Sequence, residues 1–333
     1  MRRVARLPGL VALLVLAPAA RAQTVSLALP LACTPGRTCF VQHYVDHDQS
    51  SAARDHACGP RTYDGHDGTD FRLTTRPEAA RGPGTVLAAA EGRVLRTRND
   101  APDVSVRETG RAAVAGVECG NGLVIAHADG YETQYCHLAK GSLRVKPGDR
   151  VAAGQPLGQV GLSGATEFPH LHFTLRRGGR TVDPFAPGLA AGACAAAASL
   201  DGSLWNDAAR RSLDYRAGTV LNAGFAPGPV TMEAVEDETI GAVPRDPDAL
   251  VAWIRAIGLD TGDVQRLSLA GPDGRVVAER EEPALARPRA QSLLFAGRKR
   301  PTGGWPPGTY TATFAVRRGG ADAVTHRFTL TLP

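Results

Sequence analysis

This 333-residue chain has little net positive charge once its N-terminus is set aside. The formal net charge is +5, but Arg2, Arg3, Arg6 and Arg21 supply +4 of it, which leaves 5 − 4 = +1 for the remainder. A nearly neutral remainder lacks the basic footprint of a dedicated nucleic-acid binder. Hydrophobic residues make up 43% and charged residues 21%, so the composition also excludes wholesale disorder.

A long hydrophobic run is missing as well. The apolar stretch from Leu7 to Ala19 is shorter than the ~20 residues that a membrane-spanning helix needs, and no later segment qualifies. An arginine-rich start precedes this stretch, and the small residues Ala20 and Ala22 follow it. We therefore predict that residues 1–22 are a signal peptide cut before Gln23, that no integral membrane segment remains, and that the protein is periplasmic or secreted.

No Cys-x-x-Cys motif occurs, which argues against a redox motif and against a structural zinc site. Six cysteines remain in the mature chain, and an even number in an exported protein predicts three disulfides. Cys119 and Cys136 flank a predicted hairpin, so we expect them to pair. The pairing of the other four is open, with Cys39–Cys58 as our guess.

Helical periodicity is nearly absent between residues 63 and 186, where short strand patterns alternate with glycines. Residues 84–95 are typical of a strand, a tight turn and a second strand. Residues 121–127 and 131–137 are typical of a hairpin that turns near Asp129 and Gly130. The region is predicted to be β-structured.

The rest of the chain divides around this region. Residues 23–62 form an irregular N-terminal segment that contains cysteines, and residues 187–204 read as an Ala-rich linker. In residues 205–333, alternating apolar and polar positions with turns at 271–274 and 319–320 predict an immunoglobulin-like β-sandwich. We see no catalytic constellation in this accessory domain, and its pattern indicates a fold rather than a ligand.

Histidines and one well-spaced aspartate cluster in the central region. His66 and Asp70 are four residues apart, a spacing that lets both converge on one cation where a loop enters a strand. His170 and His172 are two apart, so in a strand they project from the same face. His137 lies at the end of the predicted hairpin.

Three nitrogen and oxygen ligands with a fourth position left for water are typical of a catalytic zinc site. Zinc lowers the pKa of its bound water towards ~7, which creates a nucleophile at ambient pH. Histidines that do not bind the metal can accept a proton, donate one to a leaving amine, or stabilise an oxyanion.

Seven motifs occur in order between residues 63 and 186, and together they carry a resemblance. They are Gly65-His66-Asp67-Gly68-Thr69-Asp70-Phe71, Gly120-Asn121-Gly122-Leu123-Val124-Ile125 leading to His127, Thr133-Gln134-Tyr135-Cys136-His137-Leu138, Val145-Lys146-Pro147-Gly148-Asp149, Val160-Gly161-Leu162-Ser163-Gly164, His170-Leu171-His172-Phe173 and Asp183-Pro184. This part of the sequence resembles the lysostaphin-type, LytM-like zinc endopeptidases, which cut peptide bonds in bacterial peptidoglycan.

The resemblance implies a fold, a site and a function. It implies a mainly β chain, with an antiparallel β-sheet LytM-like peptidase domain at 63–186 followed by the predicted sandwich. His66, Asp70 and His172 would hold one zinc ion per chain, with His137 and His170 as the catalytic pair. The implied function is hydrolysis of peptide cross-links of peptidoglycan through a zinc-activated water, with a peptidoglycan peptide as partner and no nucleic acid.

An alternative is a non-catalytic cell-wall binding protein or amidase activator that retains the metal site. All five site residues are present, so the chain does not look like the metal-free members of the family, which serve as amidase activators. The other polar residues nearby are given structural roles: Asp67 as a solvated loop acid, His127 as a strand cap and Tyr135 as a groove wall or packing residue. A sharper hypothesis concerns residues 23–60, with His43, His47 and His56: they lie across the groove and occupy the open zinc position in a latent form.

Overall fold

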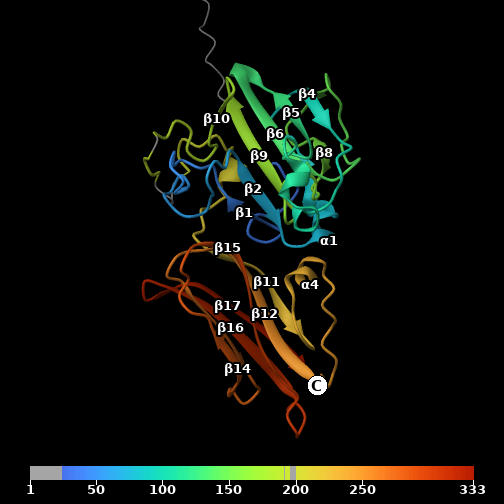
Figure 1. Cartoon of the computed structure of the whole chain (residues 1–333), viewed down its shortest axis with the longest axis vertical. Helices are drawn as coiled ribbons and strands as arrows, with labels where there is room; N and C mark the ends of the chain where they lie inside the picture. The colour runs from blue at the N-terminus through green and yellow to red at the C-terminus, as the bar shows by residue number, and fades with distance from the viewer. Residues whose placement is uncertain (1–24, 191, 196–199) are drawn as a thin grey trace, which may run out of the picture.

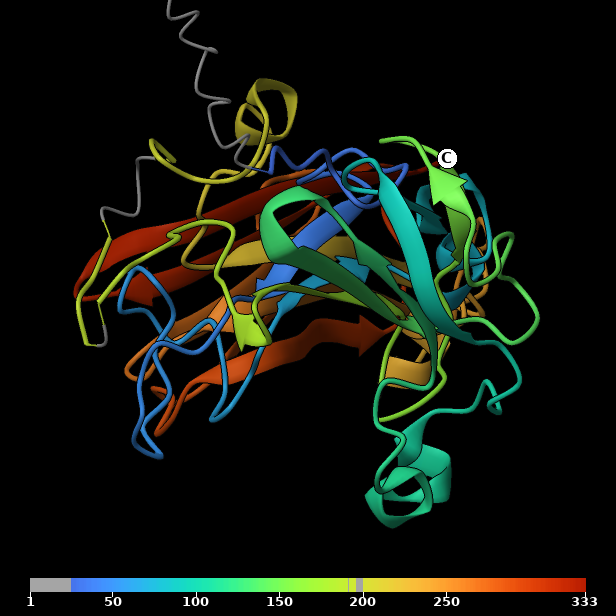
Figure 2. The same ribbon diagram turned by 90° about the horizontal axis from the view of Figure 1, so that it is seen from above.

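The structure is a computed structural model that describes residues 25–190, 192–195 and 200–333. The predicted signal peptide and its cleavage site lie outside these residues. Two β-rich parts are stacked along the long axis of the molecule (Figure 1). The view from above shows the long strands of the second part lying behind the first (Figure 2). The chain is mainly antiparallel β, as predicted.

The first part is built on an eight-stranded antiparallel sheet. Seven of its strands follow the order β1-β2-β9-β6-β5-β4-β7, and β10 pairs with the end of β9. The bounds of these strands in chain order are β1 (Cys39–His43), β2 (Thr69–Leu73), β4 (Gly92–Arg98), β5 (Asn121–Ala126), β6 (Tyr131–Leu138), β7 (Arg150–Val151), β9 (His170–Arg177) and β10 (Arg180–Thr181).

The centre of this sheet determines where the functional side chains lie. β2 and β6 both pair with β9, and the register places Asp70 and Cys136 opposite His172. The hairpin predicted at 121–137 is confirmed as β5 and β6, which turn through a short 3₁₀ segment at Ala128–Gly130. Phe71 and Phe173 are fully buried in the core beneath the sheet.

The strand, turn and strand predicted at 84–95 form, but the two strands do not pair with each other. β3 (Thr85–Leu87) pairs with β8 (Pro156–Gln159) in a separate two-stranded sheet, whereas β4 joins the large sheet. A long-range partner displaces the local one here. Short helical turns complete the chain: α1 (Arg76–Ala79), η1 (Gly82–Gly84), α2 (Val106–Thr109), η2 (Arg111–Val114), η3 (Ala128–Gly130), α3 (Asp207–Arg210) and α4 (Met232–Glu236).

The second part, here called the C-terminal unit, comprises residues 219–332. Its two antiparallel sheets share one core, to which β12, β13, β15 and β16 all contribute. The turn predicted at 271–274 joins β13 to β14, and the turn at 319–320 joins β16 to β17. Its strands are β11 (Thr219–Ala226), β12 (Ala249–Leu259) and β15 (Arg289–Lys299) in one sheet, and β14 (Val276–Glu281), β13 (Val264–Ala270), β16 (Gly308–Arg318) and β17 (Ala321–Leu332) in the other. An immunoglobulin-like class for this unit stays a prediction.

The segment between the two parts packs against the first. Trp205, Ala209 and Leu213 lie in the core of the eight-stranded sheet, although residues 205–333 were assigned from sequence to the accessory domain. Trp205 contacts both Phe71 and Phe173 through its ring. The predicted domain boundaries stay predictions, but the second set of strands begins only at Thr219.

Three disulfides join the six cysteines of the described residues. Cys119–Cys136 is present as predicted. The guess of Cys39–Cys58 is wrong, because the structure pairs Cys33 with Cys39 and Cys58 with Cys194. The second of these bonds ties the predicted Ala-rich linker to the N-terminal segment. Among the described residues, no helix is long and apolar enough to cross a membrane.

A buried cluster of charged residues joins the two parts. Glu236 in α4 lies 3.2 Å from Arg72 of β2 and 3.3 Å from Arg255 of β12, and all three side chains are fully buried. The Arg255 guanidinium also donates to the Thr74 carbonyl. Nearby, Phe40, Leu221 and Ile257 form a small apolar cluster across the same junction. The C-terminal unit is therefore packed against the sheet that carries the candidate site.

Candidate metal centre

His66, Asp70 and His172 meet at one point on the eight-stranded sheet. His66 lies in the turn before β2, Asp70 in β2 and His172 in β9, where the register sets it opposite Asp70. His66 Nε2 and His172 Nδ1 lie 3.2 and 2.9 Å from Asp70 Oδ1, and 3.2 Å from each other. The sequence-predicted ligand set is thus brought together by the fold.

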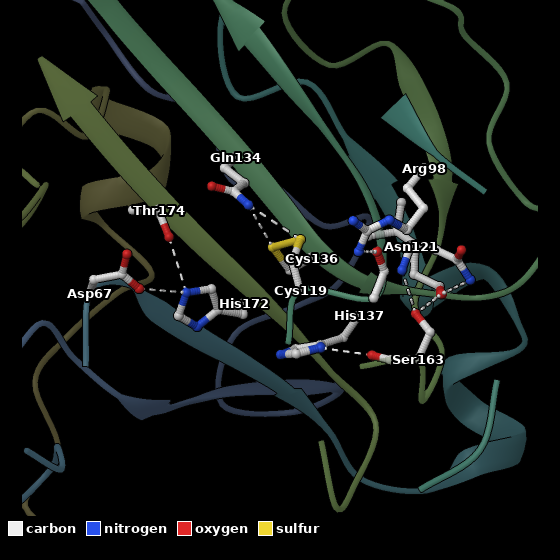
Figure 3. Close-up of a disulfide and its surroundings, with 12 residues drawn as sticks. Asp67, Arg98, Cys119, Asn121, Gln134, Cys136, His137, Ser163, His172 and Thr174 are labelled. Carbon is white, nitrogen blue, oxygen red and sulfur yellow. Dashed lines mark hydrogen bonds and ion pairs between the residues drawn. A yellow bond between two sulfur atoms is a disulfide. The ribbon is translucent and has the colours of Figure 1, made fainter. Parts of the chain in front are cut away.

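Each of these side chains is fixed through its other polar atom. His66 donates from Nδ1 to the Tyr44 carbonyl at 2.7 Å, which leaves Nε2 as an acceptor. His172 donates from Nε2 to Asp67 at 3.2 Å, with the Thr174 hydroxyl at 3.0 Å, which leaves Nδ1 (Figure 3). Such outer partners set the tautomer and orientation of metal-binding histidines.

Asp70 is fixed in the same way, by a residue that the sequence did not indicate. Its Oδ2 accepts a hydrogen bond of 2.9 Å from His43 Nδ1 in β1, which pairs with β2. Oδ1 is left to face the two imidazoles. His43 lies 27 positions before Asp70, and only the pairing of β1 with β2 brings them together.

Two imidazoles and one carboxylate oxygen form a donor set suited to zinc. The three facing atoms are all acceptors when the histidines are neutral, so they repel one another unless a cation or a proton lies between them. Their separations and their fixed outer partners fit a bound metal ion. A catalytic zinc site keeps a fourth position for water or substrate, and Asp70 lines a cleft together with His137 and His170.

The charges around the centre follow from this crowding. Burial by itself would raise the pKa of Asp70, but His66 and His170 with hydrogen bonds from His172 and His43 hold it well below its usual range. Burial would lower the pKa of His172, but Asp67 and Asp70 raise it to about 9. In the metal-free protein His172 therefore carries the proton that a metal ion would displace.

His137 and His170 lie beside the three ligands. Their ring centroids are 4.7 Å apart, and His170 Nε2 lies 3.6 Å from Asp70 Oδ1. His137 donates from Nδ1 to the Ser163 carbonyl at 2.8 Å, and Figure 3 shows its other nitrogen on the side of His172. His170 donates from Nδ1 to the Phe168 carbonyl at 3.0 Å. Both therefore present Nε2 as an acceptor.

Burial keeps these two histidines neutral. It lowers the pKa of His137 well below its ordinary value and that of His170 to about 4. His137 also has a positive φ of 64°, an uncommon conformation for a residue other than glycine. Its backbone is held by hydrogen bonds to Cys119 and Gly161, next to the Cys119–Cys136 disulfide.

A cleft of about 400 Å³ opens beside this centre. His43, Tyr63, Asp70, His137 and His170 line it. The lining also includes residues of the C-terminal unit, namely Gly258, Pro288, Arg289 and Ala290. The centre is thus reached through a space that two parts of the chain enclose.

The N-terminal segment contributes to this cleft at a few points only. β1 is the edge strand of the large sheet, so most of the segment is built into the fold rather than laid over the groove. Tyr63 stacks on His66 with ring centroids 4.4 Å apart and is 51% exposed. His47 and His56 do not reach the centre: they lie 2.8 and 3.7 Å from Asp183.

The residues given structural roles from the sequence divide into two groups. His127 bonds to the Glu91 carbonyl and to Thr133, and the fully buried Tyr135 accepts from the Ala89 amide, so both support the sheet. Asp67 is more than a solvated acid, because it accepts from His172 and pairs with Arg176 at 2.7 Å. The position of Asp67 directly after His66 in the sequence is only a weak signal that it would contact His172.

An antiparallel sheet that presents a His/Asp/His donor set with two further histidines defines a metallopeptidase-like site. Residues 64–184 match the model of peptidase family M23. The chain is 34% identical over 119 residues to the peptidoglycan DD-endopeptidase ShyA of Vibrio cholerae, a match that covers 35% of this chain and 22% of ShyA. It is also 34% identical over 101 residues to the murein hydrolase activator EnvC of Escherichia coli, covering 30% of this chain and 22% of EnvC.

Among solved structures, a zinc-containing peptidase from Vibrio cholerae matches with 27% identity and a TM-score of 0.27, covering 44% of this chain and 39% of that one. The matches to ShyA and EnvC each span less than a quarter of the length of the relative. The match to the M23 model, residues 64–184, covers the part of the chain that contains His66, Asp70 and His172.

Proposed function

We propose that this chain is an exported zinc endopeptidase that hydrolyses peptide cross-links of bacterial peptidoglycan. The observation that carries the proposal is the combination of a complete His/Asp/His donor set with His137 and His170, both held with Nε2 as an acceptor beside it. A protein that only binds the cell wall has no need of two buried, neutral imidazoles next to a metal centre.

The chain's own residues then perform the proton transfers. His66, Asp70 and His172 would hold the zinc ion, which when bound would supply Lewis-acid chemistry for the scissile carbonyl and the attacking water. His137 and His170 are neutral at working pH, so either can accept a proton at Nε2 and return it to the departing amine. The imidazolium formed in between is an electrostatic partner for the developing oxyanion.

Export and substrate follow from two further observations. Three disulfides are typical of proteins that fold in an oxidising compartment, which supports a periplasmic or secreted location. The similarity to a peptidoglycan DD-endopeptidase supports peptidoglycan as the substrate.

A second candidate function is activation of a murein hydrolase without catalysis by this chain. The similarity to EnvC favours it, since that relative is named as an activator at the same percentage identity as ShyA. The two candidates differ in what the metal centre does. An activator releases no peptide product on its own, whether or not zinc is bound.

The test measures zinc content and the conversion of purified cross-linked muropeptide dimers to monomers on the same samples. Wild type should bind one zinc and release monomers, whose masses identify the bond. His137→Asn, which tolerates the positive φ, should keep the zinc and slow release by roughly 10²–10⁴-fold. His127→Asn, in the same sheet but outside the centre, is the control and should behave as wild type.

The outcomes separate the candidates. Zinc binding by wild type without any release of monomers would contradict the peptidase and favour the activator. Release that His137→Asn leaves unchanged would remove His137 from the catalytic pair. Folded wild type that binds no zinc would contradict the metal centre itself.

A further inference from the structure

Part of the lining of the cleft belongs to the C-terminal unit. Arg289 begins β15 and pairs with Leu259 of β12, next to Gly258. Pro288, Arg289, Ala290 and Gly258 line the same cleft as His137 and His170. β15, which lies outside the M23 match, thus begins at the cleft that holds the candidate catalytic pair.

Close contacts with the first part of the chain hold this part of the C-terminal unit in place. Gly258 has a positive φ of 68°, and a Cβ there would lie 2.6 Å from the side chain of Arg61, so the two parts approach closely at this point. Arg61 in turn donates to the carbonyls of Val41 and Arg216. With the buried Glu236 cluster, these contacts set the position of the start of β15 relative to the metal centre.

Two exposed arginines, Arg289 and Arg111, line this cleft. Arg289 makes no ion pair or side-chain hydrogen bond within the part of the chain that the structure describes. Arg111 in η2 has a single acidic neighbour, Glu167, at 3.7 Å, and its side chain is 76% exposed. Glu167 is shared with Arg107 at 3.4 Å, and such an exposed pair contributes little.

The remaining charges in the cleft do not neutralise these two. Asp70 is committed to the metal centre, and Glu167 is the other carboxylate that lines the cleft. Arg61 is buried, and its guanidinium donates to backbone carbonyls rather than to an acid. With a metal ion bound, the cleft carries a surplus of positive charge, which favours an anionic substrate.

We propose that Arg289 and Arg111 bind a free carboxylate of the substrate peptide, so that the C-terminal unit takes part in substrate selection. The proposal rests on the proposed function and adds a chemical requirement to it. A guanidinium matches a carboxylate with two parallel charged hydrogen bonds, which a carboxamide in the same position does not accept equally. A peptide with a free carboxylate near the scissile bond is therefore the preferred substrate.

The test compares two substrates that differ in one chemical group. Cross-linked muropeptide dimers are used in their native form and after conversion of their carboxylates to amides. The enzymes are wild type, Arg289→Gln, Arg111→Gln and the control Arg298→Gln, an exposed arginine at the far end of the same strand β15. The quantities measured are zinc content, kcat and KM.

Wild type should prefer the native dimers. Arg289→Gln and Arg111→Gln should each raise KM for the native dimers about tenfold, with kcat nearly unchanged, because one charged hydrogen-bonding partner is lost. Both variants should keep one zinc and match wild type on the amidated dimers. Arg298→Gln should equal wild type on both substrates. Equal losses on both substrates, or no loss on the native one, would overturn the proposal.

Failure of the proposed function gives a different result. Wild type would then bind zinc and hydrolyse neither form of the dimers. In that case binding of the same dimers by calorimetry decides the question of the carboxylate. Tighter binding of the native form by wild type, lost in Arg289→Gln, supports the arginine pair; equal binding of both forms contradicts it.

Discussion

Asp70 and Arg72 lie two residues apart on β2 and face the same side of the sheet, yet the groups around them differ in kind. Asp70 meets two imidazoles whose facing nitrogens are both acceptors when the rings are neutral, and its ion-pair partners in the described residues are all histidines. Arg72 meets Glu236 and Gln42 and lies over the ring of Phe168 at 3.9 Å. Hydrogen-bond acceptors face Oδ1 of Asp70, whereas donors of Arg72 are paired with acceptors.

The difference separates buried polar clusters that contain their own counter-charge from clusters of acceptors that lack a cation. The cluster around Glu236 pairs this carboxylate with the buried guanidinium groups of Arg72 and Arg255, and so joins the two parts of the chain. In the cluster around Asp70, burial would lower the pKa of His172, but Asp67 and Asp70 raise it to about 9. Acceptors that converge on one point and are held by outer partners fit a bound cation.

The largest effect is expected in the buried cluster around Glu236. Glu236→Ala should destabilise the protein by about 3–5 kcal/mol, because it leaves the buried Arg72 and Arg255 without a counter-charge. Urea unfolding with the disulfides intact measures this. Glu279→Ala, which removes an exposed partner of Arg266, is the control and should cost less than about 1 kcal/mol. A loss below about 1 kcal/mol for Glu236→Ala would show that the cluster does not hold the two parts together.

A smaller effect, on zinc affinity, is expected when the hydrogen-bond partner of His172 is removed. Asp67→Ala removes the acceptor that fixes His172, so zinc affinity should fall about 10- to 100-fold at pH 9, where about half of His172 is neutral in wild type. The loss should shrink towards pH 7, because the variant also lowers the pKa of His172 and so weakens competition by the proton. Competition with a zinc chelator measures both values. Asp64→Ala, an exposed acid three residues away, is the control; equal affinities at pH 9 would remove Asp67 from the site.

The smallest effect is the pH dependence of zinc binding by wild type. The pKa of His172 is raised to about 9, so zinc must displace its proton, and affinity should rise about tenfold per pH unit between pH 6.5 and 8.5. The stability that this proton gives the metal-free protein has the opposite dependence. It is fully present below the ordinary value near 6.5 and is lost as pH rises through about 9. A zinc affinity that does not change with pH would contradict this assignment.

Local patterns in the sequence indicated the strands and turns that carry the candidate site residues, whereas the ligand set and the catalytic pair came from the resemblance to LytM-like peptidases. The His66–Asp70 spacing, the alternation at His170 and His172 and the hairpin that ends at His137 all depend on short-range geometry, and the fold brings these residues together. The pairing of Cys119 with Cys136 followed from the same hairpin.

What the sequence did not indicate depends on long-range pairing. His43 reaches Asp70 through the addition of β1 to the edge of the sheet, and Cys58 reaches Cys194 over a sequence separation of 136. β3 leaves its neighbour β4 for β8 for the same reason. No local pattern marks these partners, because their contacts are decided by how whole strands pack.

The central claim is that the cluster around Asp70 binds a metal ion, whereas the cluster around Arg72 and Glu236 does not. Zinc titration of three proteins tests this claim most directly. Wild type and His172→Ala differ in the acceptor set, whereas Glu236→Gln changes only the paired cluster. We predict one zinc per chain for wild type and for folded Glu236→Gln, and none for His172→Ala. Zinc binding that survives in His172→Ala, or that is absent from folded wild type, would contradict the account.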